Sequence, residues 1–203
     1  HDTFGRLFRL LDAKVFEACF REWISDLAGV VAGVVAIDGK TACGSRDGHN
    51  TALHTVSAYA TASGLCLGQE HTRGKGHEIP AIKALLDTLA LKGCIVTIDA
   101  IGCQTEIARK ILDRGGDYLL AVKDNQKDLA DALREFFADG EPRGFGSLPV
   151  SRFQSLEKAH GRIETRQAMW VTNLSWLDKK LREHWPKLAG LGMIERQREI
   201  NGA

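Results

Sequence analysis

The chain has 203 residues, of which 44% are hydrophobic and 26% are charged, and its formal net charge is +1. These values are typical of a globular protein and exclude an intrinsically disordered chain, whereas a charge near zero neither supports nor excludes a nucleic-acid partner. The longest apolar run, residues 27–37, contains two glycines and is too short to span a bilayer. Because no signal peptide opens the chain either, we expect a cytoplasmic protein without membrane segments.

The cysteines are widely scattered and include no CxxC pair, which excludes a zinc ribbon and a disulfide framework. They are Cys19, Cys43, Cys66, Cys94 and Cys103. We expect all of them to be buried or free thiols in a reducing compartment.

The first 27 residues carry a helical pattern. Apolar residues recur at spacings of three and four in two segments, 4–11 and 16–27. Asp12 lies between these segments and is the predicted N-cap of the second helix. Since the chain begins within this pattern and without a methionine, we expect residues 1–32 to be the helical tail of a longer N-terminal region.

Residues 33–140 alternate between apolar strands and amphipathic helices, with a hairpin turn predicted at Ser63-Gly64. The predicted elements are, in chain order, strands at 33–37, 51–60 and 65–71, a helix at 78–90, a strand at 94–98, a helix at 105–112, a strand at 118–122 and a helix at 125–137. Three antiparallel strands followed by strands entered from helices predict an α/β fold, with a ribonuclease H-like mixed five-stranded sheet and flanking helices.

After Gly140 the pattern becomes strand-rich. The expected elements are strands at 150–155 and 162–172, a short helix at 176–185 and a final strand at 193–199. We interpret residues 141–203 as a strand-rich insertion, and we expect the α/β core of residues 33–140 to be incomplete at its C-terminus.

Two aspartates directly follow apolar strands of the predicted sheet. Asp38 follows the first strand and Asp99 follows the fourth. If a right-handed crossover makes these strands parallel neighbours, the two residues lie side by side at one sheet edge, with backbones about 5 Å apart. The alternative is that each aspartate only caps a turn, since Asp38-Gly39 is also a common turn dipeptide.

Paired carboxylates of this kind point to a metal-ion site. Adjacent carboxylates repel each other and need a cation, and hard oxygen ligands select Mg²⁺ or Mn²⁺ over zinc. Two such ions about 4 Å apart activate a water and stabilise the leaving oxygen in phosphodiester cleavage.

Basic and polar residues fall in the loops at the strand ends. If these loops share one sheet edge, they form a rim around the two acids and are suited to phosphate contacts. The alternative is that each is a solvated loop residue. The rim consists of Lys40, Arg73, Lys75, His77, Lys123, Asn125 and Gln126.

Two competing motifs are weaker. Gly39-Lys40-Thr41 would need a glycine at position 34 to form a phosphate-binding loop, but that residue is Val34. His160 and Glu164 have the spacing of two metal ligands on a helix, although their surroundings favour a strand or a turn.

Six sequence blocks in order closely resemble the ISAs-type transposases, also called H-repeat-associated proteins. The resemblance covers nearly the whole chain, and HDTFGRLFRLLD at 1–12 resembles the junction after that family's N-terminal domain. The blocks are VVAIDGKTACGS (34–45), LHTVSAYATASGLCLGQ (53–69), HEIPAIKALLDTL (77–89), LKGCIVTIDAIGCQTEIARKI (91–111), GGDYLLAVKDNQ (115–126) and HGRIETR (160–166).

The resemblance implies a DDE transposase that uses Mg²⁺ to cleave and transfer DNA strands at insertion-sequence ends. Asp38 would be its first acid and Asp99 its second. Arg162 and Glu164 match a family block in the insertion, and Glu164 is the fallback candidate for the third acid, because the family's own glutamate lies in a later helical block that this chain does not reach. The implied partners are terminal repeats, target DNA and, as a candidate assembly, a homodimer.

Two other functions stay open. The chain could be an inactive transposase remnant that only binds DNA or a protein partner. It could also be a related ribonuclease H-like nuclease that acts in DNA repair. Dependence on insertion-sequence ends would separate the transposase from the repair nuclease, and metal-dependent cleavage would separate it from the remnant.

Overall fold

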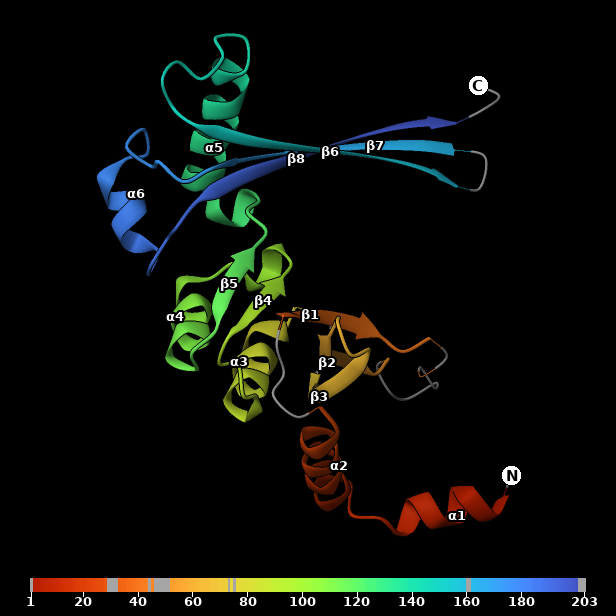
Figure 1. The fold of residues 1–203 in the computed structure, drawn as a ribbon. Coiled ribbons are helices and arrows are strands. Elements are labelled where there is room, and N and C mark those ends of the chain that lie inside the picture. Colours follow the sequence, from red (N-terminus) through yellow and green to blue (C-terminus); the bar gives the residue numbers. More distant parts are fainter. Residues whose placement is uncertain are drawn as a thin grey trace. The chain divides into compact units, whose positions relative to one another are not determined.

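The computed structural model describes residues 2–28, 33–43, 45, 52–72, 74, 76–159 and 162–200. The chain divides into two compact units, His1–Ala121 and Val122–Ala203. Figure 1 labels the helices and strands of both units. The division into 1–32, 33–140 and 141–203 that the sequence suggests stays a prediction. Among the described helices, none combines the length and the apolar character that crossing a membrane requires.

Two helices open the first unit, as predicted. They are α1, Asp2–Leu10, and α2, Ala13–Ala28. Asp12 is the N-cap of α2, because its Oδ1 accepts hydrogen bonds from the backbone N–H groups of Lys14 at 2.9 Å and Val15 at 3.1 Å. Helix α2 contacts the following sheet, and its Ile24 is buried in the same core.

A five-stranded sheet forms the centre of the first unit, in the order β3-β2-β1-β4-β5. The pairs β1/β2 and β2/β3 are antiparallel, whereas β1/β4 and β4/β5 are parallel. The strands are β1 Gly33–Thr41, β2 His54–Ala60, β3 Leu65–Thr72, β4 Cys94–Ile98 and β5 Asp117–Leu120. This mixed order is the ribonuclease H-like arrangement, and it confirms the predicted fold class.

Helices cover one face of this sheet (Figure 1). They are α3, Glu78–Thr88, and α4, Thr105–Asp113, with a short 3-10 helix at Ala100–Gly102 between β4 and α4. Their apolar sides meet the sheet residues that point to the same face, and the side chains of this core that are fully buried include Val35, Val96, Leu85, Ile107 and Ile111. The opposite face carries exposed apolar residues, namely Tyr59, Ile95 and Leu119.

Strand β1 is longer than predicted. It pairs with β4 only from Gly33 to Ile37, and it then continues along β2 as far as the Thr41↔His54 pair. Asp38 therefore lies inside a strand, at the point where pairing with β4 stops. The prediction that the strand stops at Ile37 was wrong. The added residues are mostly polar and pair only with β2, so an apolar pattern does not reveal this part of the strand.

The second unit contains a three-stranded antiparallel sheet in the order β6-β7-β8, as the strand-rich pattern predicts. Its elements are a 3-10 helix at Asp124–Gln126, α5 Lys127–Gly140, β6 Val150–Ala159, β7 Arg162–Val171, α6 Lys179–His184 and β8 Leu191–Ile200. Helix α5 contacts β8, and the buried side chains here include Phe137, Met169, Val171 and Trp185. Asp178 caps α6 by accepting hydrogen bonds from the backbone N–H groups of Lys180 and Leu181.

Candidate active site

The two predicted acids lie at the same end of two neighbouring parallel strands. The register of β1 and β4 ends with Ile37 opposite Ile98, so Asp38 is the next residue of β1 and Asp99 directly follows β4. Both isoleucines are buried on the helix-covered face, whereas Asp38 and Asp99 are exposed. Because side chains alternate along extended backbone, the two aspartates continue on the opposite, open face. The structure thus brings together the two positions that the sequence selects, and their catalytic role stays a prediction.

Lys40 is the nearest cation to the first acid among the described ion pairs. Its Nζ lies 3.7 Å from Oδ2 of Asp38, and the two side chains are 84% and 61% exposed. An ion pair this exposed contributes little to stability. Lys40 is therefore able to leave the Asp38 carboxylate and contact a phosphate beside it.

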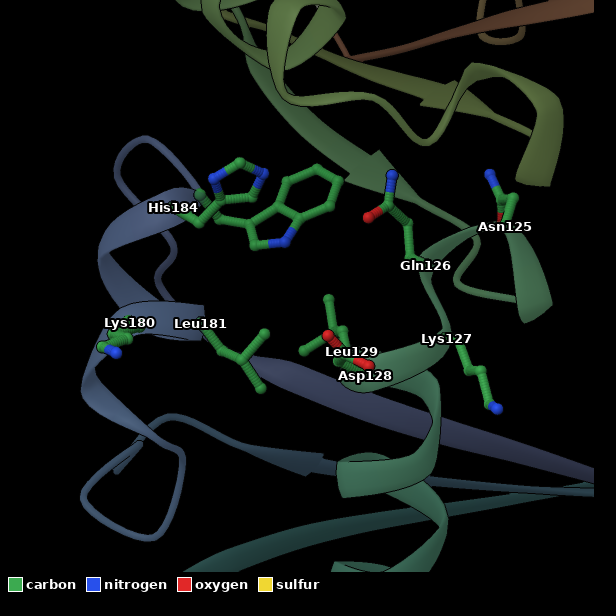
Figure 2. Close-up of a pocket in the computed structure, with 9 residues that line it drawn as sticks. Asn125, Gln126, Lys127, Asp128, Leu129, Lys180, Leu181 and His184 are labelled. Carbon is green, nitrogen blue, oxygen red and sulfur yellow. The ribbon is translucent and has the colours of Figure 1, made fainter.

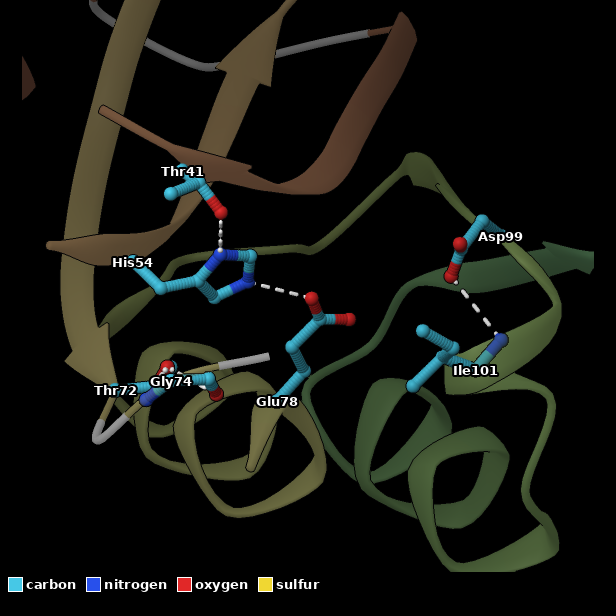
Figure 3. A network of polar contacts seen from close by, with 7 residues as sticks. All are labelled: Thr41, His54, Thr72, Gly74, Glu78, Asp99 and Ile101. Carbon is cyan, nitrogen blue, oxygen red and sulfur yellow. Dashed lines mark hydrogen bonds and ion pairs between the residues drawn. The ribbon is translucent and has the colours of Figure 1, made fainter. Parts of the chain in front are cut away.

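Asp99 also acts as a helix cap. Its Oδ1 accepts a hydrogen bond of 3.1 Å from the backbone N–H of Ile101, at the start of the short 3-10 helix (Figure 3). The turn-cap alternative therefore describes a real contact of Asp99. A carboxylate has about four lone-pair sites, so this one hydrogen bond leaves room for metal coordination. For Asp38 the turn alternative was wrong, since the residue lies in strand β1.

A buried polar network lies beneath the strand that carries Asp38. His54 shares a 2.8 Å hydrogen bond through Nδ1 with Thr41 Oγ1, and a 2.5 Å hydrogen bond through Nε2 with Glu78 Oε1 (Figure 3). His54 is 3% exposed and Glu78 is 5% exposed. Glu78 stands in the first turn of α3, where a carboxylate is favoured by the helix dipole. The network connects the end of β1 to β2 and to the N-terminus of α3.

Gly39 makes room for this network. A Cβ atom at position 39 would lie 2.6 Å from Glu78 Oε1 and 3.0 Å from His54 Nε2, closer than non-bonded atoms approach. Glycine is therefore needed next to Asp38 because of a buried carboxylate, and the turn interpretation of the Asp-Gly pair was wrong. Since Gly39 faces the covered side, Asp38 faces away from Glu78.

The sequence interpretation missed both His54 and Glu78. A signal was present, because His54 keeps the alternation of the buried residues Val56, Ala58 and Ala60 along β2. A histidine in phase with a buried apolar face requires a polar partner in the interior. Glu78 gives a weaker signal, since an acidic residue in the first turn of a helix is common at the surface.

Two residues of the predicted basic rim are described in the first unit, and the prediction that the rim surrounds the two acids stays a prediction. Lys40 accompanies Asp38, and the exposed His77 precedes α3. Arg73 and Lys75 lie outside the described residues. The remaining predicted DNA-binding residues belong to the second unit, and for Arg162 only the backbone, at the start of β7, is described. These residues are Lys123, Asn125, Gln126 and Arg162.

Glu164, the fallback third acid, lies in β7 of the second unit and is 7% exposed. Its Oε1 forms an ion pair with Arg166, and its Oε2 lies 3.4 Å from Nη2 of Arg198. Burial alone would raise the pKa of this carboxyl group, but the neighbouring arginines outweigh it and lower the pKa. Metal binding by Glu164 would require these ion pairs to open. His160, its partner in the weaker metal motif, lies outside the described residues.

The aspartate pair fits a hard divalent cation. Asp38 and Asp99 supply carboxylate oxygens at an exposed edge, and Mg²⁺ is commonly held by one or two carboxylates while it keeps several waters. Within the described part of the chain, no group of three histidine, cysteine, aspartate or glutamate side chains is arranged to hold a metal ion. A three-acid site would therefore need one further carboxylate beside this pair.

The second unit also contains an open pocket of about 430 Å³ (Figure 2). It lies between the start of α5 and the end of α6, and the buried Trp185 forms part of its wall. Two of its lining residues, Asn125 and Gln126, are among the predicted DNA-binding residues. Its cationic side chains are Lys127 and Lys180.

Comparison with known proteins places these features in a family. "Uncharacterized protein in dhlA 3'region" of Xanthobacter autotrophicus is 42% identical over 100% of this chain and 68% of its own length. "Putative transposase YncI" of Escherichia coli K12 is 44% identical over 81% of this chain and 66% of its own length. "H repeat-associated putative transposase YhhI" of the same strain is 41% identical over 82% of this chain, which spans 44% of that relative. The chain is thus shorter than these relatives.

Solved structures are more distant. The piggyBac transposase in a synaptic complex with hairpin DNA matches 80% of this chain and 40% of its own, with 13% sequence identity and a TM-score of 0.37. The family comparison is decisive, because the model of the transposase DDE domain matches residues 3–186. The chain therefore belongs to the transposase DDE domain family.

Proposed function

We propose that this chain carries two of the three acids of a metal-dependent DNA transposase, which cleaves and joins DNA strands at insertion-sequence ends. The observation that supports this most is the register of β1 and β4, which makes Asp38 and Asp99 neighbours on the open face of a ribonuclease H-like sheet. Family membership supports the same activity.

Asp38 and Asp99 would hold Mg²⁺ or Mn²⁺ through their carboxylate oxygens. When bound, such ions supply an activated oxygen nucleophile and neutralise charge on the leaving oxygen. Lys40, 3.7 Å from Asp38, would contact a non-bridging phosphate oxygen of the DNA strand at the same edge. The His54–Glu78 network would keep β1 extended, so that the Asp38 carboxylate is positioned before DNA binds.

Further DNA contacts are proposed for the residues that the sequence selects. Asn125 and Gln126 line the pocket at the start of α5, where the N–H groups of the first helical turn also favour a phosphate. The complete set is Arg73, Lys75, Lys123, Asn125, Gln126 and Arg162. Glu164 remains the fallback third acid within this chain. The protein would act in the cytoplasm, on DNA of the nucleoid.

A second function has specific support. Within the described residues, no group of three histidine, cysteine, aspartate or glutamate side chains could hold a metal ion. An inactive remnant that binds DNA or a protein partner without cutting would share this feature. The two functions differ in metal binding and in cleavage.

Metal binding to three variants tests the proposal. Mn²⁺ titration should show binding by the wild type and at least a tenfold weaker affinity in Asp38→Asn and Asp99→Asn, since each removes one of two charged ligands. Asp117→Asn, an exposed aspartate at the opposite end of the same sheet, is the matched control and should bind Mn²⁺ normally.

Cleavage of a duplex that carries the terminal repeat of the element, with Mn²⁺ present, completes the test. If the wild type cleaves this duplex and both Asp38→Asn and Asp99→Asn do not, the result supports the transposase. DNA binding without cleavage, together with normal Mn²⁺ affinity in Asp38→Asn and Asp99→Asn, favours the remnant and removes the two aspartates from any metal site.

A further inference from the structure

One face of the three-stranded sheet in the second unit carries aromatic rings and arginines in adjacent rows. Antiparallel register places Ser151, Trp170 and Gly192 in one row, and Phe153, Ala168 and Ile194 in the next. The following row contains Arg166 and Arg196, and the row after that contains Glu164 and Arg198. We call this surface the Trp170 face.

Trp170 lies flat on this face. A Cβ atom at Gly190 would be 2.5 Å from the indole ring, and a Cβ atom at Gly192 would be 2.8 Å from it. Gly192 in the neighbouring strand β8, and Gly190 just before that strand, therefore make room for the ring to lie across their backbone. The side chain is still 40% exposed, so one face of the indole is open to solvent.

Phe153 extends the aromatic surface. It is 70% exposed and stands diagonally from Trp170, with Ile194, 74% exposed, in its own row. Diagonal neighbours on a sheet are about 7–8 Å apart, within reach of aromatic side chains. Large exposed apolar side chains in one patch indicate a binding surface.

The arginines next to these rings are held in place. The buried Glu164 pairs with Arg166 and Arg198, and Arg166 also contacts Glu157 at 3.1 Å. The side chains of Arg166 and Arg198 remain 43% and 40% exposed. Each guanidinium has five N–H donors, so these pairs leave donors that can reach a phosphate, and fixed arginines lose less entropy when they bind one.

The opposite face of the same strands is different. The charges on that face sum to zero, because Arg152 and Lys158 are balanced by Glu195 and Glu199. On the Trp170 face, three described arginines stand against two glutamates. The excess positive charge and the flat indole thus occur on one side of the sheet.

We propose that the Trp170 face binds single-stranded DNA, with bases stacked on Trp170 and Phe153 and phosphates on Arg166, Arg196 and Arg198. Stacking on exposed aromatic rings accepts any base and requires bases that are not already stacked in a duplex. The excess positive charge favours a polyanion over a neutral or basic protein partner. The choice of DNA over RNA rests on the proposed transposase function.

Fluorescence anisotropy with a labelled oligothymidylate of about 15 nucleotides, near the length that single-strand binding folds cover, tests the proposal. The full chain should bind the single strand more tightly than a duplex of the same length. Trp170→Leu should weaken binding about tenfold or more, and Phe153→Ala should weaken it to a similar extent. Trp170→Phe should weaken binding less, because it keeps an aromatic ring. Tryptophan fluorescence should be quenched on binding in the wild type and unchanged in Trp170→Phe.

The salt dependence of binding separates the contribution of the arginines from that of the aromatic rings. With three phosphate contacts, the logarithm of affinity should fall with the logarithm of salt concentration with a slope of roughly −2, and Arg196→Gln should reduce that slope by about 0.7. Trp170→Leu should leave the slope unchanged. Lys158→Gln and Leu156→Ala, which alter the opposite face, are the matched controls and should bind like the wild type.

Equal binding by the wild type and by both aromatic variants would overturn the proposal, as would equal affinity for duplex and single strand or no binding at all. If Trp170→Leu fails to fold, as far-UV circular dichroism would show, Phe153→Ala decides the outcome because that side chain is largely exposed. Mn²⁺ titration of Phe153→Ala should match the wild type, so loss of this surface is distinguishable from loss of the metal site.

Discussion

Two buried carboxylates have opposite surroundings in this chain. Among the described residues, Glu78 and Glu164 are the buried acids. Glu78 meets one histidine ring and the backbone of Gly39, inside the first unit. Glu164 meets two arginines whose side chains reach solvent, on the sheet of the second unit. The first carboxylate thus fixes the interior beneath Asp38, whereas the second orders charges on a surface.

Removal of the Glu78 carboxylate has the largest expected effect. Glu78→Ala leaves Nε2 of the buried His54 without its hydrogen-bond partner, and breaking a buried pair from one side costs roughly 3–5 kcal/mol. The free energy of unfolding from urea denaturation of the first unit measures this loss. Glu106→Ala, which removes an exposed carboxylate paired with Lys83, is the matched control. Equal losses in the two variants would show that burial of Glu78 is not decisive.

Gly39→Ala should have a smaller effect of about 1–3 kcal/mol, because the added methyl group must displace Glu78 or shift β1. In a Glu78→Ala background the same substitution should cost much less, since the space is then free. A double-mutant cycle on the free energy of unfolding measures this coupling. Gly5→Ala, at a helical position with open space, is the control and should not destabilise. Additive losses at Gly39 and Glu78 would contradict the proposed contact.

The pH dependence of the second unit should show the smallest effect. The neighbouring arginines lower the pKa of Glu164 in the folded state. Its contribution to stability is therefore present above the pKa of the unfolded chain and is lost as pH falls through the lower folded value. Urea denaturation between neutral and acidic pH should show a flatter profile for Glu164→Gln. Glu195→Gln, which alters the opposite face, is the control and should keep the pH dependence that Glu164 contributes in the wild type. Identical pH profiles for Glu164→Gln and the wild type would show that the ion pairs between Glu164 and the arginines do not stabilise the sheet.

The order of elements could be predicted from the sequence because it depends on local periodicity. The apolar runs that become β1, β4 and β5, and the amphipathic segments that become α3 and α4, determine the ribonuclease H-like topology. Once β1 and β4 are parallel neighbours, the adjacency of Asp38 and Asp99 follows from their place after each run.

The remaining features depend on contacts between distant residues. His54 and Glu78 are 24 positions apart, and Glu164 and Arg198 are 34 apart, so no local pattern connects them. The polar end of β1 is strand only because β2 pairs with it. Long strands such as β6 and β8 are likewise defined by their partner β7, since their alternating charges would also suit a solvated loop.

The close approach of Gly39 and Glu78 also restricts the order in which this site can change during evolution. A lineage that first replaces the glycine beside Asp38 meets the buried carboxylate and loses stability, whereas one that first shortens Glu78 can afterwards accept a side chain at position 39. Relatives that lack the glycine should therefore also lack the glutamate, while relatives that lack only the glutamate are permitted. Substitutions at these two positions should be inherited together although the residues lie on different elements.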